Sequence, residues 1–199
     1  MNDSKEICLY FEKGTTYNQL EIATEIQERF PDIGNPLIVP KTNKDVPVLM
    51  YQDNPQFFLR CDFNILNFVV DHSYFKKLET MIFDLVDVFE EHGVKFVRIG
   101  YVANIYLDKK NVDKYRKNYL KEDKTKDMEE YQIYLFKELE TKYGNINSWE
   151  RVFSEGNAKH DLLLQYDFNS KHEDKIDFDM KYIKEFVKVS NDYIESRTN

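Results

Sequence analysis

Three apolar runs that follow one another at short spacing constrain the fold more than any other feature of the sequence. They cover residues 37–39, 46–52 and 56–70, and Asp53-Asn54-Pro55 is a turn signal between the last two. The third run has polar residues at Asp62 and Asn64, where we expect it to break into two strands. Connections this short join antiparallel neighbours, because a parallel pair needs a crossover of roughly a dozen residues or more. The pattern therefore predicts an antiparallel meander.

Helices are expected between the groups of strands. Thr16 is a candidate cap for a helix that ends at Arg29, just before Pro31. Ser73 is a candidate cap for a helix that runs to Glu91, since apolar residues recur there at helical spacing. Lysine-rich residues from Asn111 predict a third helix. We expect it to resume over residues 127–143 and a last helix to close the chain.

Further strands are predicted at residues 6–12, 94–107, 148–154 and 160–168. Strands therefore cluster, and helices fall between the clusters. This order is typical of an α+β fold, in which an antiparallel, meander-type sheet has helices packed over one face. We expect a single domain over residues 1–199, and no internal repeat is visible in the sequence.

Composition narrows the class of protein. The chain has 199 residues, of which 42% are hydrophobic and 15% aromatic, so there is ample material for one core. Its two cysteines lie in apolar runs, which indicates buried thiols in a reducing compartment. The N-terminus is polar, and no apolar stretch has the length that spans a bilayer. We expect a cytoplasmic protein that does not enter a membrane and carries no cofactor.

Charge is divided unevenly along the chain. The net charge is −8, although residues 109–126 contain eight basic and three acidic residues, a local balance of +5. General nucleic-acid binding is not expected, because phosphate contacts favour a basic protein. Tyrosines among these cations suit a nucleic-acid backbone or an acidic protein partner, and the acidic remainder of the chain favours the protein. Tyr115 and Tyr119 are four positions apart and could also simply pack inward. The candidate interaction residues of this stretch are Lys114, Tyr115, Arg116, Lys117 and Tyr119.

Arg98 and Asn104 are polar residues inside an otherwise apolar strand. They are six positions apart, so both side chains lie on the same face of that strand. Such a pair can bind an anion or the main chain of a partner. More often it hydrogen-bonds to neighbouring elements of the same protein.

Aspartates near the C-terminus are the only candidate metal ligands. Asp177 and Asp179 form an Asp-x-Asp pair, and Asp167 ends the preceding strand. Converging carboxylates suit a hard divalent cation such as Mg²⁺, which could support phosphoester hydrolysis. The alternative is that the pair caps the last helix, where carboxylates are favoured by the helix dipole.

Three segments together resemble a family of uncharacterised, sporadically distributed bacterial proteins. The first is the helix of residues 74–91 that leads into a strand with Arg98, Gly100 and Asn104 in that order; the others are residues 162–167 and 176–179. Val102-Ala103 departs from the family, which usually has an arginine and an aromatic residue there. The resemblance implies a link to mobile or defence-associated gene neighbourhoods and leaves the chemistry open.

Two functions are predicted from these features. The first is a non-catalytic interaction factor, such as a bacterial or phage accessory, inhibitor, immunity or adaptor protein, that binds another protein through an acidic, aromatic-rich surface. Self-association is a variant of this function. The alternative is a divalent-metal-dependent phosphoesterase or nuclease that uses Asp167, Asp177 and Asp179.

Overall fold

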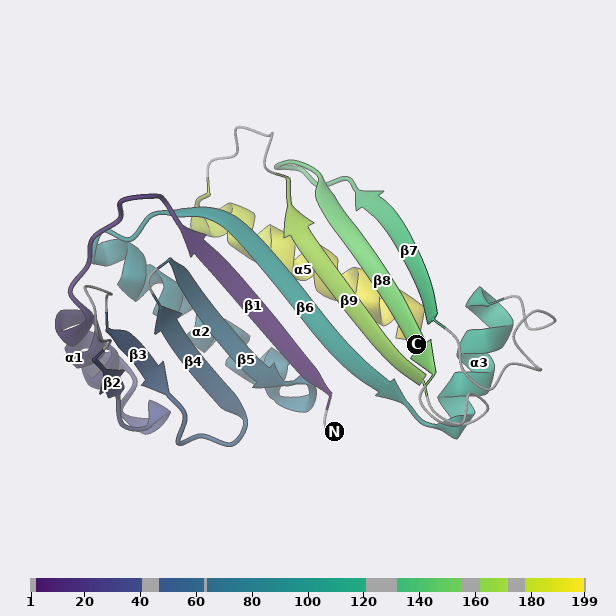
Figure 1. Ribbon diagram of the computed structural model, residues 1–199, viewed down its shortest axis with the longest axis horizontal. Helices are drawn as coiled ribbons and strands as arrows, with labels where there is room; N and C mark the ends of the chain where they lie inside the picture. The colour runs from purple at the N-terminus through teal and green to yellow at the C-terminus, as the bar shows by residue number, and fades with distance from the viewer. Residues whose placement is uncertain are drawn as a thin grey trace.

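The computed structural model describes residues 3–40, 47–62, 64–120, 132–154, 162–171 and 178–198. These residues form one nine-stranded antiparallel sheet and four α-helices, which confirms the predicted α+β fold (Figure 1). The strands are β1 Ser4–Phe11, β2 Leu37–Val39, β3 Val48–Tyr51, β4 Phe57–Asp62, β5 Ile65–Asp71, β6 Phe96–Leu107, β7 Gln132–Leu139, β8 Ile146–Ser154 and β9 Leu162–Ser170. The helices are α1 Gln19–Arg29, α2 Phe75–Glu91, α3 Lys109–Tyr119 and α5 Met180–Thr198. None of these helices is long and apolar enough to cross a membrane.

The sheet consists of two halves with similar topology, one of five strands (β1 to β5) and one of four described strands (β6 to β9). Across the sheet the strands follow the order β2-β3-β4-β5-β1-β6-β9-β8-β7. Each half begins with a strand that pairs with the last strand of its own half, β1 with β5 and β6 with β9. In each half a helix follows the first strand and a long helix follows the last. Because β1 and β6 pair antiparallel at the centre, the two halves are related by an approximate two-fold axis. No repeat in the sequence indicates this duplication.

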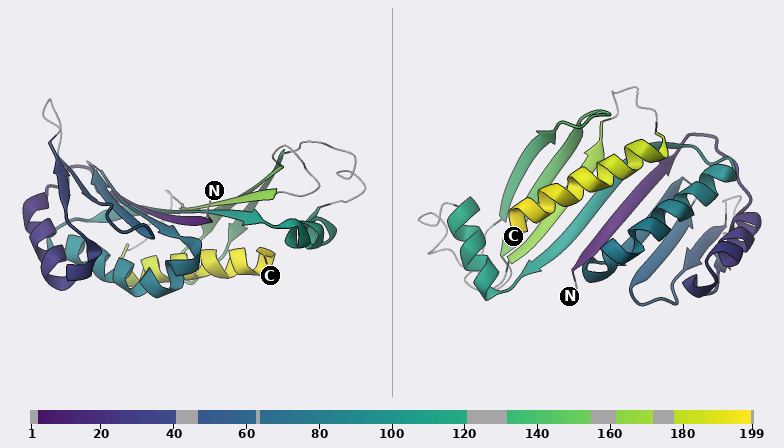
Figure 2. Two further views of the ribbon diagram at one scale, coloured as in Figure 1. Left: turned by 90° about the horizontal axis from the view of Figure 1, so that it is seen from below. Right: turned by 180° about the vertical axis from the view of Figure 1, so that it is seen from behind.

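Three helices cover one face of the sheet, and none of the helices that the structure describes covers the other, which we call the open face. In Figure 2, α1, α2 and α5 lie on the same side, and the two ends of the sheet bend away from them. The open face is therefore concave. Burial alternates along β1 and β9, with every second residue buried, because side chains of successive residues point to opposite faces. The fully buried rows, which include Leu9, Tyr101 and Phe168, lie beneath the helices.

The helix starts differ from those predicted. Asn18, not Thr16, caps α1, since its side chain accepts a hydrogen bond from the main-chain nitrogen of Leu20 at 3.1 Å. Asp71, not Ser73, caps the short 3-10 turn before α2, and Asp108 caps α3. The observed caps lie two or three residues from the predicted helix starts, and in each case a side-chain oxygen accepts from a free N–H group of the first turn.

The helix predicted over residues 127–143 is wrong within the described part of that range, because residues 132–139 form strand β7. Every residue of β7 pairs with β8, from Gln132 opposite Phe153 to Leu139 opposite Ile146. As an edge strand, β7 is exposed on both faces and lacks the period-two alternation that identifies a strand in a sequence. Its Lys and Glu residues favour a helix locally, and pairing with β8 overrides that preference.

A buried carboxylate fixes α3 and α5 to the sheet. Glu150 of β8 points to the helix-covered side and is only 1% exposed. Its oxygens accept hydrogen bonds from the Arg197 guanidinium at 3.1 Å and from the hydroxyl groups of Tyr115 and Tyr193, the latter at 3.3 Å. Burial and the nearby carboxylate raise the pKa of Tyr115, so its hydroxyl stays protonated and donates. One carboxylate thus joins both helices to β8.

Replacing this carboxylate is expected to destabilise the fold. In Glu150→Gln the partly buried guanidinium of Arg197 loses its counter-ion, and we expect the free energy of unfolding to fall by about 2–4 kcal/mol. Glu138→Gln is the matched control, since Glu138 forms its salt bridge with Lys171 in an exposed position. Urea unfolding followed by circular dichroism measures both. Equal losses in the two variants would contradict this role of Glu150.

Candidate interaction face

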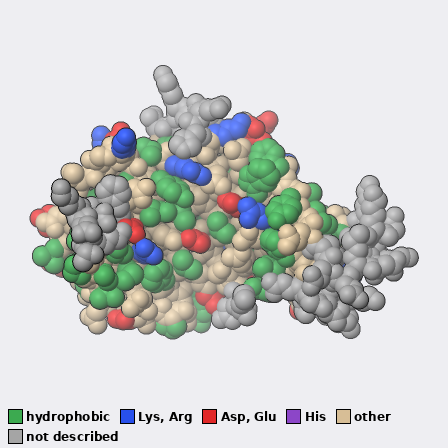
Figure 3. All heavy atoms as spheres, in the orientation of Figure 1, with side chains coloured by type: hydrophobic (Ala, Val, Ile, Leu, Met, Phe, Trp, Pro, Cys, Tyr) green, Lys and Arg blue, Asp and Glu red, His purple; other side chains and the backbone are tan. Residues whose placement is uncertain are grey.

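The open face presents the alternate residues of every strand. We define the open face by the side chains that share a side with Glu6 in the strand registers. Most of these side chains are half-buried, in contrast to the fully buried rows beneath the helices. Figure 3 shows this side of the molecule, where hydrophobic side chains lie over much of the surface with isolated charged side chains between them. Such a face is neither a closed core nor a charged, fully solvated surface.

A row of polar side chains crosses the middle of the open face. Arg151 donates to the Gln165 side chain at 3.1 Å, and Gln165 donates to the Asn104 side chain at 3.1 Å. Asn104 in turn donates to the Ser4 hydroxyl at 3.4 Å. The row joins β8, β9, β6 and β1, so it stabilises the contact between the two halves. Its members also retain donors and acceptors that a bound main chain can use.

Arg98 lies on the same face as Asn104, as the six-residue spacing predicts. Its guanidinium donates to the Asn169 side chain at 2.9 Å and lies 4.9 Å from the centre of the Tyr10 ring. Gly100, two residues along β6, carries no side chain, and a methyl group there would lie 3.4 Å from the Asn169 side-chain oxygen. Arg98 and Asn104 therefore have partners inside the molecule and are positioned on the floor of the open face.

Aromatic side chains gather at the β7 end of the open face. We call Tyr134, Phe136, Trp149 and Phe153 the aromatic corner. Phe136 and Trp149 are cross-strand neighbours with ring centres 4.6 Å apart, and Tyr134 meets Phe153 edge-on at 6.4 Å. Tyr134 is 57% exposed, Phe136 53% and Trp149 41%. Large aromatic groups at this exposure are typical of protein interfaces, because they bury much area with few rotatable bonds.

The charge of the open face is slightly negative. Its strand positions hold three basic and five acidic side chains, a balance of 3 − 5 = −2; these are Arg60, Arg98 and Arg151 against Glu6, Asp62, Asp71, Glu138 and Asp167. Arg60 lies 2.7 Å from Asp62, so part of the positive charge is compensated locally. A surface that follows a phosphate backbone needs an excess of basic groups. The open face lacks that excess.

The five candidate interaction residues of the lysine-rich stretch all lie on α3, where some pack inward and others are exposed. Tyr115 and Arg116 are buried, and Tyr115 packs inward on Glu150, which was the alternative interpretation of its spacing. The Tyr119 hydroxyl donates to the main-chain oxygen of Ser196 at 2.9 Å, and the Arg197 guanidinium lies over its ring. Lys114 and Lys117 are exposed. The aromatic residues of this stretch therefore attach α3 to α5.

The three aspartates of the candidate metal site occupy different environments. Asp167 lies on the open face, where Asn169 donates to its side chain at 2.6 Å. Asp179 accepts a hydrogen bond from the main-chain nitrogen of Tyr182 at 2.9 Å and so caps α5 on the helix-covered side. Asp177 lies outside the described residues. Among the residues that are described, no three His, Cys, Asp or Glu side chains lie close enough together to hold a metal ion.

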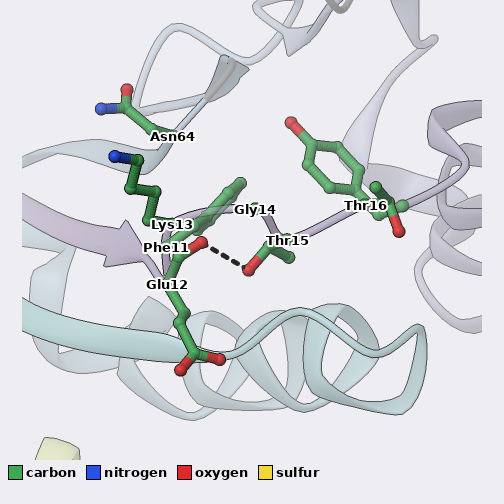
Figure 4. A pocket seen from close by; sticks show the side chains of 8 residues that line it. Phe11, Glu12, Lys13, Gly14, Thr15, Thr16 and Asn64 are labelled. Atoms are coloured by element: carbon green, nitrogen blue, oxygen red, sulfur yellow. Dashed lines mark hydrogen bonds between the residues drawn. The ribbon is translucent and has the colours of Figure 1, made fainter.

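A cavity of about 500 Å³ lies beside the loop that follows β1. Figure 4 shows its lining, which is Asn64 and the loop residues from Phe11 to Tyr17, with the Thr15 hydroxyl donating to the main-chain oxygen of Glu12 at 2.7 Å. The side chains of Glu12 and Lys13 point in different directions (Figure 4). Because its polar side chains do not converge, the cavity lacks the arrangement that orients a ligand.

Trp149 provides a direct measurement of the aromatic corner, because it is the only tryptophan of the chain. Its exposure predicts long-wavelength emission typical of indole in water, with efficient quenching by acrylamide. Phe136→Ala should increase the quenching further, since the Phe136 ring covers part of the indole. Short-wavelength emission that acrylamide does not quench would contradict an exposed corner.

Comparison of the chain with models of known protein families gives no match, and comparison with curated proteins gives none either. The features of the open face are therefore the basis for assigning a function.

Proposed function

We propose that this chain is a non-catalytic interaction protein that binds another protein at the β7 end of its open face, through strand addition to β7 and contacts with the aromatic corner. The observation that carries this proposal is the position of three exposed aromatic side chains next to the open edge of a long strand. Main-chain pairing supplies affinity in such complexes, and pockets for alternate side chains supply specificity.

The edge of the sheet at β7 supports pairing with a partner strand. β7 has eight residues and, within the described part of the chain, pairs only with β8. The opposite edge is β2, which has three residues and offers few main-chain groups. Short edge strands are one way in which proteins avoid unwanted pairing, and β7 with its eight residues lacks that protection. β7 is therefore the edge suited to a partner.

The aromatic corner adds side-chain contacts to the same edge. Tyr134 and Phe136 point to the open face from β7 itself, so the alternate side chains of an added strand would lie beside them at about 5 Å. Trp149 lies one strand further in, within reach of long side chains from the partner. Burying these rings removes a large apolar area from water, which favours binding by roughly 25 cal/mol per Å² before the costs of association.

A protein partner agrees with the charge of the open face better than a nucleic acid does. The balance of −2 repels phosphate, and the arginines there have carboxylate, amide or aromatic neighbours. The proposal includes a cytoplasmic location and a role as an inhibitor, immunity or adaptor factor, in keeping with the family that the sequence resembles. Metal-dependent phosphoester hydrolysis gains no support from Asp179, which caps α5.

The experiment is affinity capture from the native cell background with matched variants. The double variant Tyr134→Ser/Phe136→Ser removes two exposed rings of the aromatic corner, and we expect it to lose a partner that the wild type retains. Leu20→Ser is the control, since Leu20 is 66% exposed on α1, away from the open face. Mass spectrometry identifies the protein, and size-exclusion chromatography of the purified chain detects self-association.

A protein that is retained by the wild type and Leu20→Ser but lost from the double variant is the expected result. Capture that does not differ between the three forms would contradict binding at the aromatic corner. If the only protein lost from the double variant is the chain itself, the partner at the aromatic corner is a second copy of this chain and not a different protein. A nucleic acid that is lost only from the double variant would overturn the choice of a protein partner.

A further inference from the structure

A cleft on the helix-covered side is separate from the open face. It lies between the start of α2 and the second half of α5, above β1, and has a volume of about 590 Å³. In the view from behind, α2 and α5 run on either side of β1 (Figure 2). The cleft is lined by Lys5, His72, Ser73, Phe75, Lys76, Glu79, Lys188, Asn191, Asp192 and Glu195.

Lys5 forms the floor of this cleft and is only 6% exposed. Its ammonium nitrogen donates to the Asn191 side-chain oxygen at 2.7 Å and lies 4.4 Å from the centre of the Phe75 ring. Within the described residues, no carboxylate oxygen lies within 4.0 Å of this nitrogen. A buried ammonium without a carboxylate partner is costly for a folded protein, and a bound anion would offset that cost.

Burial lowers the pKa of Lys5 to about 8, against the attraction of Glu195 and Glu79. The group is therefore still mainly an ammonium at neutral pH. Asn191 accepts one of its three N–H groups, and both Asn191 and Phe75 line the same cleft as Lys5. Tyr101 also donates to the same Asn191 oxygen, at 2.7 Å, which fixes the orientation of the amide.

His72 provides an unpartnered ring nitrogen in the same cleft, within the described part of the chain. Its ring nitrogen Nδ1 is buried and, among the described residues, has no hydrogen-bond partner. Burial, and then the positive charge of Lys5, lower the pKa of His72, which places the two side chains in one electrostatic environment. A buried ammonium without a carboxylate neighbour and an unpartnered imidazole nitrogen, which donates in its Nδ1–H tautomer, both favour an anionic group in this cleft.

The rim of the cleft limits how much negative charge a ligand can carry. Lys5, Lys76 and Lys188 contribute three positive charges, and Glu79, Asp192 and Glu195 contribute three negative charges, so the formal balance is 3 − 3 = 0. A nucleotide or another polyanion would meet the three carboxylates without an excess of basic groups. A single carboxylate needs only the local positive charge on the floor.

We propose that this cleft binds a small organic molecule through one carboxylate group, which lies against Lys5 Nζ and His72 Nδ1. The carboxylate supplies the counter-ion that Lys5 lacks and the partner that His72 lacks. The rest of the molecule lies along Phe75 towards the mixed charges of the rim. The site is on the opposite side of the sheet from the aromatic corner, so it does not depend on the proposed partner binding.

The test uses acetate as the probe and the Lys5 side chain as the reporter. Titration of protein labelled with ¹³C at the lysine Cε gives the pKa of Lys5 with and without acetate. We expect a saturable upward shift of that pKa, because a nearby anion favours the ammonium form. Binding should weaken about tenfold per pH unit above the pKa of free Lys5, since the neutral amine offers no charge.

Two variants and a second probe make the outcome decisive. Lys5→Met should abolish the acetate effect on thermal stability, while Lys181→Met, at an exposed position of α5, should retain it. Absence of a saturable shift, or equal acetate stabilisation of Lys5→Met, would overturn the site. Tighter binding of inorganic phosphate than of acetate would overturn the choice of a carboxylate.

The pH dependence of stability checks the buried ammonium without any ligand. The pKa of Lys5 in the folded chain, about 8, is below its ordinary value of 10.5. Between these values the unfolded chain holds a proton that the folded chain has released, so stability rises with pH in this window. We therefore expect Lys5→Met to be more stable than the wild type at pH 7, with the difference shrinking from pH 8 to 10.5 in urea unfolding. A wild type that is more stable than Lys5→Met at pH 7 would contradict the cost of burying Lys5.

Discussion

The antiparallel pairing of β1 with β6 is the contact on which the rest of the molecule depends. It joins two halves that each close on themselves, β1 with β5 and β6 with β9, and it makes one sheet of nine strands. The polar row from Ser4 to Arg151 crosses the same seam on the open face, and Lys5 lies on the opposite side of β1. The cleft thus lies directly over a central strand, whereas the aromatic corner lies at the edge of the same continuous sheet.

The two sites follow from how the halves are covered. Three helices lie over one side of the sheet and none of the described helices lies over the other, so the concave side keeps its side chains available (Figure 2). On the covered side, α2 and α5 belong to different halves, and they leave the cleft above β1 where they diverge. The proposed partner site and the small cleft therefore lie on opposite faces of one sheet, over different strands.

Much of the fold was predictable because local pattern and tertiary structure agree. The run of residues 56–70 breaks at the predicted place, and α2 ends before Gly93, where φ is +81°. β7 was not predictable in this way, since an edge strand exposed on both faces has no burial pattern. The aromatic corner was missed for the same reason, because Tyr134 and Phe136 were assigned to a helix. Glu150 and Lys5 gave no signal either, since a single charged residue in a strand does not reveal which face is covered.

The measurement that tests the central claim most directly is hydrogen–deuterium exchange of the chain alone and in complex with its captured partner. Strand addition predicts that the main-chain amides of β7 exchange more slowly in the complex, while those of the β2 edge do not change. Protection confined to the helices, with β7 exchanging as fast as in the free chain, would contradict binding at this edge.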